Sequence, residues 1–276
     1  MKKTVVENLY IVSTGFCSGG CEVCLRGSPV NSEISDSTLD KLLSQIDAAE
    51  VITYSGGEPF ERKEALKRTM NAIERHKVTT KIHGLWTNGW FYDKEIEEIF
   101  ERAEENYNFD GKSRNLKRGG IYLSQDKFHR DRLDSLKEGH PEKYQKYKEA
   151  IDLLKTSDFY LPSPRIELPT LYLEGNVIKN EAKIRLENPD IKIIPTPIRG
   201  MSVKEYDNCF VIPYMAVNFD GIVTESSVSF DRMQEFDYGN VHDAEPLVKQ
   251  LEYTAYTQGR LSSKVPYDYQ FASRNY

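Results

Sequence analysis

The chain has 276 residues, which is enough for one large domain or two small ones, with a sizeable hydrophobic core. Acidic residues outnumber basic ones, 43 Asp and Glu against 37 Lys and Arg, and the formal net charge of −6 disfavours a general nucleic-acid-binding protein. No apolar run is long enough to span a membrane, and residues 1–8 contain no signal-peptide core, so we expect a cytoplasmic protein.

Short apolar runs alternate with helical patterns over the first 200 residues. Runs of β-branched and aromatic residues predict strands, at residues 9–12, 51–54, 81–86, 121–123, 165–168 and 191–194. Apolar residues repeated every three or four positions predict helices, at residues 36–49, 66–73, 96–103 and 144–154. Because strands that alternate with helices are typical of βα units, we predict an α/β fold around a parallel sheet.

The chain changes character after residue 208. Two apolar segments, residues 215–219 and 222–223, flank Asp220 and Gly221, a pair that is typical of a tight hairpin turn. The sequence contains no internal repeat that would place this segment among the βα units. We therefore predict a C-terminal extension that contains a β-hairpin.

Three of the four cysteines lie close together in a glycine-rich loop. Cys17, Cys21 and Cys24 have the spacing C-x3-C-x2-C, and soft thiolates select zinc, copper(I) or iron–sulfur clusters. A structural zinc ion takes four ligands, but the nearest histidine is His76. Three thiolates on a four-iron cluster would instead leave one iron open to a substrate or cofactor. The pattern favours a cluster, against a zinc site completed from afar or three unrelated thiols.

A second motif follows the second predicted strand. Gly56 and Gly57 expose backbone groups to a ligand, and Glu58 can accept hydrogen bonds from a ligand amino group. Alone, these residues would be a strand-to-helix turn with Pro59 opening the helix. Here they follow the cysteine loop by one βα unit. The two motifs together form a more specific pattern than either motif alone.

With these motifs the sequence resembles the radical S-adenosylmethionine (radical SAM) enzymes. The matching residues are Cys17, Cys21, Cys24, Gly56, Gly57, Glu58, Pro59, Thr87, Asn88, Gly89, Ser124 and Asp126. Each group follows a predicted strand, at the end where parallel α/β barrels place active sites. The resemblance covers roughly residues 8–200 and implies a partial (β/α)6 TIM-like barrel.

The resemblance also implies cofactors and roles. The three cysteines would hold a [4Fe-4S] cluster whose fourth iron binds S-adenosylmethionine, with Gly56, Gly57 and Glu58 at its amino end and Asn88 and Ser124 near its carboxylate and ribose. The reduced cluster would cleave S-adenosylmethionine to methionine and a 5′-deoxyadenosyl radical that abstracts hydrogen from a substrate. An external one-electron reductant, of the flavodoxin or ferredoxin type, would supply the electron.

One departure from the family pattern precedes the third cysteine. The residue there is often aromatic in the family and is Val23 in this chain. The departure leaves no assigned partner for the adenine ring and does not touch the cluster ligands.

The C-terminal part resembles the SPASM or Twitch extensions of peptide-modifying members. Ser226 and Ser227 stand where a cysteine is expected, and only Cys209 remains, so no second thiolate-ligated cluster is expected. The expected division is a barrel over residues 1–205 and an extension over residues 206–276 that caps it. Either this scaffold persists without its cluster, or the likeness is a coincidence.

The substrate is expected to be a peptide, from the C-terminal resemblance alone. A small molecule or nucleoside is the alternative, and outside the enzymes the alternative is an iron–sulfur or zinc protein that acts as a sensor or electron carrier. An electron carrier has no use for Gly56, Gly57 and Glu58 after the second strand.

Two further residues are candidates for roles in the reaction. Cys209 would donate hydrogen to a substrate radical in a redox-neutral epimerisation, or it would simply pack as a small buried side chain. His129 follows the fourth predicted strand and would contact substrate or ribose, or remain an ordinary loop histidine.

Overall fold

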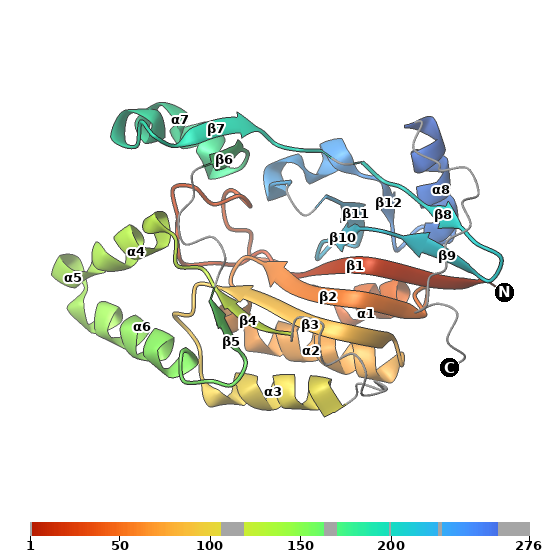
Figure 1. The fold of residues 1–276 in the computed structure, drawn as a ribbon, viewed down its shortest axis with the longest axis horizontal. Coiled ribbons are helices and arrows are strands. Elements are labelled where there is room, and N and C mark those ends of the chain that lie inside the picture. Colours follow the sequence, from red (N-terminus) through yellow and green to blue (C-terminus); the bar gives the residue numbers. More distant parts are fainter. Residues whose placement is uncertain (1, 106–118, 163–169, 199, 226–227, 259–276) are drawn as a thin grey trace.

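The computed structural model describes residues 2–105, 119–162, 170–198, 200–225 and 228–258 (Figure 1). Five parallel strands are neighbours in chain order in its main sheet: β1 (Lys3–Thr14), β2 (Ala48–Gly56), β3 (Thr79–Thr87), β4 (Gly120–Leu123) and β5 (Tyr160–Pro162). Two further parallel strands, β6 (Thr170–Leu173) and β7 (Lys192–Pro195), pair only with each other among the described residues. The strands therefore form an incomplete barrel wall.

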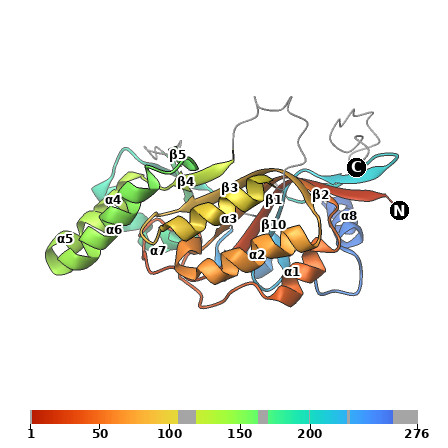
Figure 2. The ribbon, with the colours of Figure 1, turned by 90° about the horizontal axis from the view of Figure 1, so that it is seen from below.

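Helices follow most of these strands. They are α1 (Asp36–Leu43), the 3-10 helix η1 (Pro59–Arg62), α2 (Lys63–Arg75), α3 (Lys94–Glu105), α4 (Lys127–Asp134), α5 (Leu136–Gly139), α6 (Pro141–Leu154) and α7 (Asn176–Glu187). Figures 1 and 2 show α1, α2 and α3 side by side on one face of the main sheet. The core lies here, because alternate strand residues such as Ile52 and Tyr54 are fully buried, as are Leu39 and Leu66 of the helices.

The C-terminal extension builds onto the first strand of the barrel. It follows β8 (Lys204–Glu205) and contains β9 (Cys209–Ile212), β10 (Met215–Val217), β11 (Ile222–Thr224), the 3-10 helix η3 (Phe230–Phe236), β12 (Gly239–Asn240) and α8 (Leu247–Thr257). β9 and β10 both pair in parallel with β1, and β11 returns antiparallel beside β10. The turn uses Gly221 in the left-handed region, with φ +83°, where a side chain would be strained. The extension thus continues the sheet of the barrel.

The structure confirms the α/β fold, the parallel sheet of a partial barrel and the C-terminal hairpin. The helix predicted at residues 36–49 is wrong at its end, since α1 stops at Leu43 and Ala48 and Ala49 belong to β2. These two alanines pair with β1, so sheet hydrogen bonding overrides their helical propensity. The strand predicted at residues 165–168 lies outside the described residues. The helices α4, α5, α7 and α8 were not predicted.

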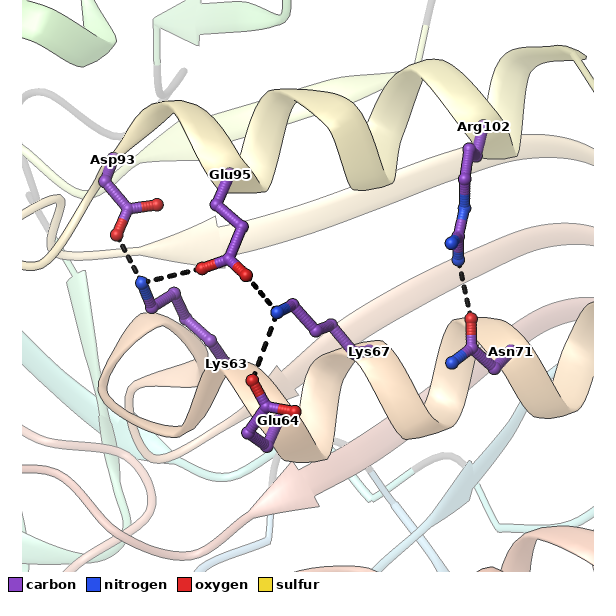
Figure 3. A network of polar contacts seen from close by, with 7 residues as sticks. All are labelled: Lys63, Glu64, Lys67, Asn71, Asp93, Glu95 and Arg102. Atoms are coloured by element: carbon purple, nitrogen blue, oxygen red, sulfur yellow. Dashed lines mark hydrogen bonds and ion pairs between the residues drawn. The ribbon is translucent and has the colours of Figure 1, made fainter.

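Polar side chains link α2 to α3 along their exposed surfaces (Figure 3). The contacts join Lys63 to Asp93 and Glu95, Lys67 to Glu64 and Glu95, and Arg102 to Asn71. Exposed ion pairs stabilise a fold by about 0–1 kcal/mol each, so these fix the pairing of the helices more than the overall stability. Within the described ranges, none of the helices combines the length and apolarity that a membrane crossing requires.

Candidate functional site

The cysteine loop follows β1 and packs on the turn that follows β2. The amide of Gly57 donates to the carbonyl of Thr14 at 2.8 Å, and the amide of Glu58 donates to the carbonyl of Phe16 at 2.7 Å. A side chain at Gly56 would meet the Thr14 oxygen at 2.1 Å, and one at Gly57 would meet the Phe16 oxygen at 2.0 Å. Both glycines are therefore required by the close approach of the two loops, a role that the sequence did not reveal.

Two of the three sulfurs converge above Gly19. The point where a Cβ of Gly19 would lie is 3.2 Å from the Cys17 sulfur and 3.7 Å from the Cys21 sulfur. The Gly19 amide also donates to the Cys17 sulfur at 3.3 Å. Cys24 follows in a tight turn, because its amide donates to the carbonyl of Cys21 at 3.2 Å. The three cysteines thus lie in one short loop, and the convergence of all three sulfurs stays a prediction.

Burial raises the pKa of the Cys17 and Cys24 thiols above the ordinary value. Thiols in such surroundings ionise readily only when a cation is beside them, so a bound metal centre would displace their protons. Among the described residues, no three His, Cys, Asp or Glu side chains are grouped as ligands of a single metal ion. Thiolates bound to separate irons of a cluster lie farther apart than ligands of one ion. Three thiolates in one loop are a donor set that an iron–sulfur cluster takes, and each would bind a separate iron.

Glu58 joins the ends of β2 and β3. Its carboxylate accepts hydrogen bonds from the Asn88 amide at 2.8 Å, the Thr87 hydroxyl at 2.6 Å and the Phe60 amide at 3.1 Å. The residue is only 2% exposed, and burial raises the pKa of Glu58 to about 7. The folded state thus favours the neutral carboxyl, and the stability from this group is complete below pH 4.5 and lost as the pH rises through about 7.

Asn88 is turned toward the cysteine loop. Its Nδ2 atom is 3.7 Å from the same point above Gly19 that the two sulfurs approach. The Asn88 Oδ1 atom accepts from the Trp90 amide at 2.9 Å, which leaves the Nδ2 group facing the loop. Ser124 lies at the end of the next strand, where its amide donates to the Thr87 carbonyl at 2.8 Å and its side chain is half-buried. The structure thus gathers Asn88 with the cysteines and places Ser124 one strand away.

His129 also belongs to this site. Asp126 caps the start of α4 by accepting from the His129 amide at 3.1 Å, and its other oxygen lies 2.6 Å from His129 Nδ1. Burial alone lowers the pKa of His129, but hydrogen bonds with Asp126 and with the Cys21 sulfur outweigh it and raise the pKa to about 10. His129 therefore contacts the cysteine loop. The sequence analysis had expected it to contact only substrate or ribose.

The start of α7 holds the cysteine loop from a distant part of the sequence. The amide of Asn176 donates to the Cys24 carbonyl at 2.9 Å, and its side-chain Nδ2 donates to the Cys21 carbonyl at 2.9 Å. Gly175, with φ +58°, approaches so closely that a side chain would meet the Cys24 oxygen at 2.4 Å. Sequence analysis missed these residues, since about 150 positions separate them from the cysteines and no motif links the two.

Replacing Asn176 by alanine is expected to loosen the hold on the cluster ligands. Loss of one hydrogen bond of about 1 kcal/mol to the Cys21 carbonyl should make iron release to a chelator about three- to tenfold faster. The control is Asn180→Ala, because Asn180 donates to the carbonyl of the non-cysteine residue Glu22 at 3.0 Å, in the same loop. Equal release rates in the two variants, at equal unfolding midpoints, would contradict this role.

Glu174 connects this part of the barrel to the extension. The residue is 0% exposed, and its carboxylate accepts from the Ser229 hydroxyl at 2.6 Å and the Thr196 hydroxyl at 3.1 Å. Its ion pair with Arg232 is 2.6 Å long. A buried carboxylate is costly without partners. This network therefore fixes the η3 segment against the turn between β6 and α7, which in turn contacts the cysteine loop.

Cys209 does not reach the site, so its predicted role as hydrogen donor is wrong. It is buried in β9 against Val5, Ala48 and Val211, and it pairs with Lys3 at the start of β1. The cysteine loop follows the other end of this strand of 12 residues. At about 3.3 Å per residue, the two places are about 35 Å apart. Cys209 is therefore a packing residue, the alternative that the sequence had left open.

No protein-family model and no curated protein matches the chain. Among solved structures it is similar to native anSMEcpe with bound AdoMet and the Cp18Cys peptide, with 15% identity and a TM-score of 0.49 over 93% of this chain and 82% of that chain. Hexahistidine-tagged anSMEcpe with bound AdoMet gives 16% identity and a TM-score of 0.49 over 92% and 82%. Streptococcus suis SuiB bound to its precursor peptide SuiA gives 12% and 0.46 over 98% and 70%. At these identities and TM-scores, the similarities assign no activity to this chain.

Proposed function

We propose that this protein is a radical SAM enzyme. Cys17, Cys21 and Cys24 would hold a [4Fe-4S] cluster, and Glu58 with its neighbouring glycines would hold the amino end of S-adenosylmethionine. When bound, these groups would supply a 5′-deoxyadenosyl radical that abstracts hydrogen from a substrate. The chain itself binds, orients and shields them.

The observation that carries this proposal is the direct linkage of three strand ends. The Glu58 amide is hydrogen-bonded to the cysteine loop at Phe16, and its carboxylate is hydrogen-bonded to Asn88. The Asn88 side chain in turn faces the sulfurs of Cys17 and Cys21. A thiolate site, a buried carboxylate and an amide thus meet at the carboxyl end of a parallel sheet, where α/β folds place ligands. An electron carrier needs only the first of these.

The substrate that we propose is a peptide, which the barrel of residues 1–205 would bind under the extension of residues 206–276. The support is the retained hairpin of β10 and β11, which persists beside β1 although the extension has a single, buried cysteine. A flavodoxin- or ferredoxin-type protein would supply the electron. Epimerisation loses its support, since it depended on Cys209. A small molecule or nucleoside is the alternative substrate.

The test is anaerobic reconstitution with iron and sulfide, reduction with dithionite and incubation with S-adenosylmethionine. We expect 5′-deoxyadenosine and methionine in the reaction, identified by mass spectrometry. Reconstituted protein that holds a reducible cluster but forms no 5′-deoxyadenosine would contradict the proposal and favour an electron carrier. Incubation with candidate peptides should increase the yield, whereas stimulation by small molecules or nucleosides alone would overturn the peptide assignment.

A further inference from the structure

Arg26 is a buried cation beside the cysteine loop that the proposed reaction does not use. It lies two residues after Cys24 and is 7% exposed. Its guanidinium donates to the Val228 carbonyl at 3.1 Å and to the Ser55 hydroxyl at 3.4 Å. The side chain therefore spans from the end of β2 to the extension.

Arg26 has no carboxylate partner among the described residues, and the ionisable groups that act on its charge are Tyr214, Cys24 and Tyr10. Two buried carboxylates of the site are satisfied elsewhere: Glu58 by Asn88, Thr87 and Phe60, and Glu174 by Arg232 and hydroxyl groups. A guanidinium has five N–H donors, and the two contacts of Arg26 are to neutral oxygens. Burying a cation without a counterion is unfavourable. The remaining donors are therefore suited to an anion that comes with a ligand.

The face of the sheet beside Arg26 is the one that the helices leave uncovered. Ile52 and Tyr54 of β2 point into the helix-covered core, so Thr53 and Ser55 point to the other face. Half-buried aromatic side chains share that face: Tyr10 on β1, in contact with Tyr214 at 5.2 Å between ring centroids, and Trp86 and Tyr122, stacked at 4.9 Å. The ring of Phe230 lies 5.9 Å from the Arg26 guanidinium carbon. This face offers aromatic surface, with Arg26 at its edge toward the cysteines.

We propose that Arg26 binds a carboxylate of the substrate. It would thereby position an acidic molecule against the aromatic side chains of this face. The planar fork of a guanidinium matches a carboxylate with two parallel hydrogen bonds. A dianionic phosphate fits less well, because a single guanidinium balances only one of its two charges. The inference rests on the proposed function and narrows its substrate to a carboxylic acid. The carboxylate of S-adenosylmethionine is the other source of the same chemistry, and the experiment separates the two.

The experiment measures binding of N-acetyl-L-tyrosine and N-acetyl-L-tyrosinamide to the reconstituted holoenzyme by anaerobic NMR titration. The two probes differ in one charge and nearly match in shape. We expect the wild-type protein to bind the carboxylate roughly ten- to a hundredfold more tightly than the amide. Arg26→Gln should bring this ratio to about one, and Arg26→Lys should give an intermediate ratio. The affinity for S-adenosylmethionine should not change.

The matched control is Arg132→Gln. Arg132 donates to the Gly19 carbonyl at 2.8 Å, so it also lies at the cysteine loop, but it is exposed. This variant should keep the wild-type ratio. A wild-type ratio of one, an unchanged ratio in Arg26→Gln, or an equal loss in Arg26→Gln and Arg132→Gln would overturn the proposal.

Two further outcomes are decisive. Weaker binding of S-adenosylmethionine by Arg26→Gln with an unchanged probe ratio would assign the arginine to the cofactor and overturn the proposal. If Arg26→Gln loses the cluster, the Arg26→Lys variant tests the proposal instead. A wild-type preference for the carboxylate probe in that variant would contradict binding by the planar guanidinium. The probe ratio needs no turnover, so a protein that forms no 5′-deoxyadenosine would refute the proposed function and still report on Arg26.

Discussion

Replacing Cys17, Cys21 or Cys24 by alanine is expected to remove bound iron and to abolish cleavage of S-adenosylmethionine. The three side chains share one short loop, and the fourth cysteine, Cys209, lies at the other end of β1 and cannot replace a lost thiolate. Cluster occupancy depends on the number of thiolates, so two should not retain it. Iron and sulfide content per chain after anaerobic reconstitution measures the first effect, and 5′-deoxyadenosine measures the second.

The control for this experiment is Cys209→Ala, which removes the fourth cysteine of the chain. Because Cys209 packs at the opposite end of β1, that variant should keep its iron and its activity. Iron content that falls equally in all four alanine variants would contradict the assignment of Cys17, Cys21 and Cys24 as the cluster ligands. Wild-type protein that carries zinc and no sulfide after anaerobic purification would contradict the cluster itself.

Local patterns were sufficient to predict most of the fold. The strands and helices of the first three βα units follow from apolar periodicity, because each buries one face on the same core. The boundary between α1 and β2 did not follow, since Ala48 has good helical propensity and only its pairing with Val5 in β1 and Thr79 in β3 makes it a strand residue. The attachment of β9 and β10 to β1 was equally hidden, because more than 190 residues separate these partners.

The candidate site divides in the same way. The cysteines, Glu58 and Asn88 could be proposed as site residues because their spacing after consecutive strands is visible in the sequence. The hydrogen bonds from Asn176 to the cysteine loop could not be predicted. An asparagine at the start of a helix is ordinary until its partner carbonyls are known. The role of Cys209 was misjudged for the converse reason: its chemistry suggested a hydrogen donor, and only its position in the sheet excludes it. Residue type indicates what a side chain can do, and topology decides where it does so.

Glu58→Gln is expected to weaken binding of S-adenosylmethionine roughly ten- to a hundredfold while the iron content stays unchanged. The amide keeps the shape of the side chain but removes the charge of the acceptor, and a hydrogen bond to a charged group contributes about 1.5–3 kcal/mol. The matched control is Glu61→Gln. Glu61 lies in the same turn and accepts from the Ser18 amide at 2.8 Å, so it contacts the cysteine loop and not the proposed amino group.

The pH dependence of binding identifies the acceptor as Glu58. Because burial raises the pKa of Glu58 to about 7, the group is mostly neutral at pH 6 and mostly ionised at pH 8. Wild-type affinity for S-adenosylmethionine, measured by anaerobic titration, should therefore increase about tenfold between these values, with a proton released on binding near neutral pH. Glu61→Gln should show the same increase, and Glu58→Gln should show none. A variant at Glu58 that folds, keeps its cluster and retains both the wild-type affinity and its pH dependence would remove this carboxylate from the cofactor site.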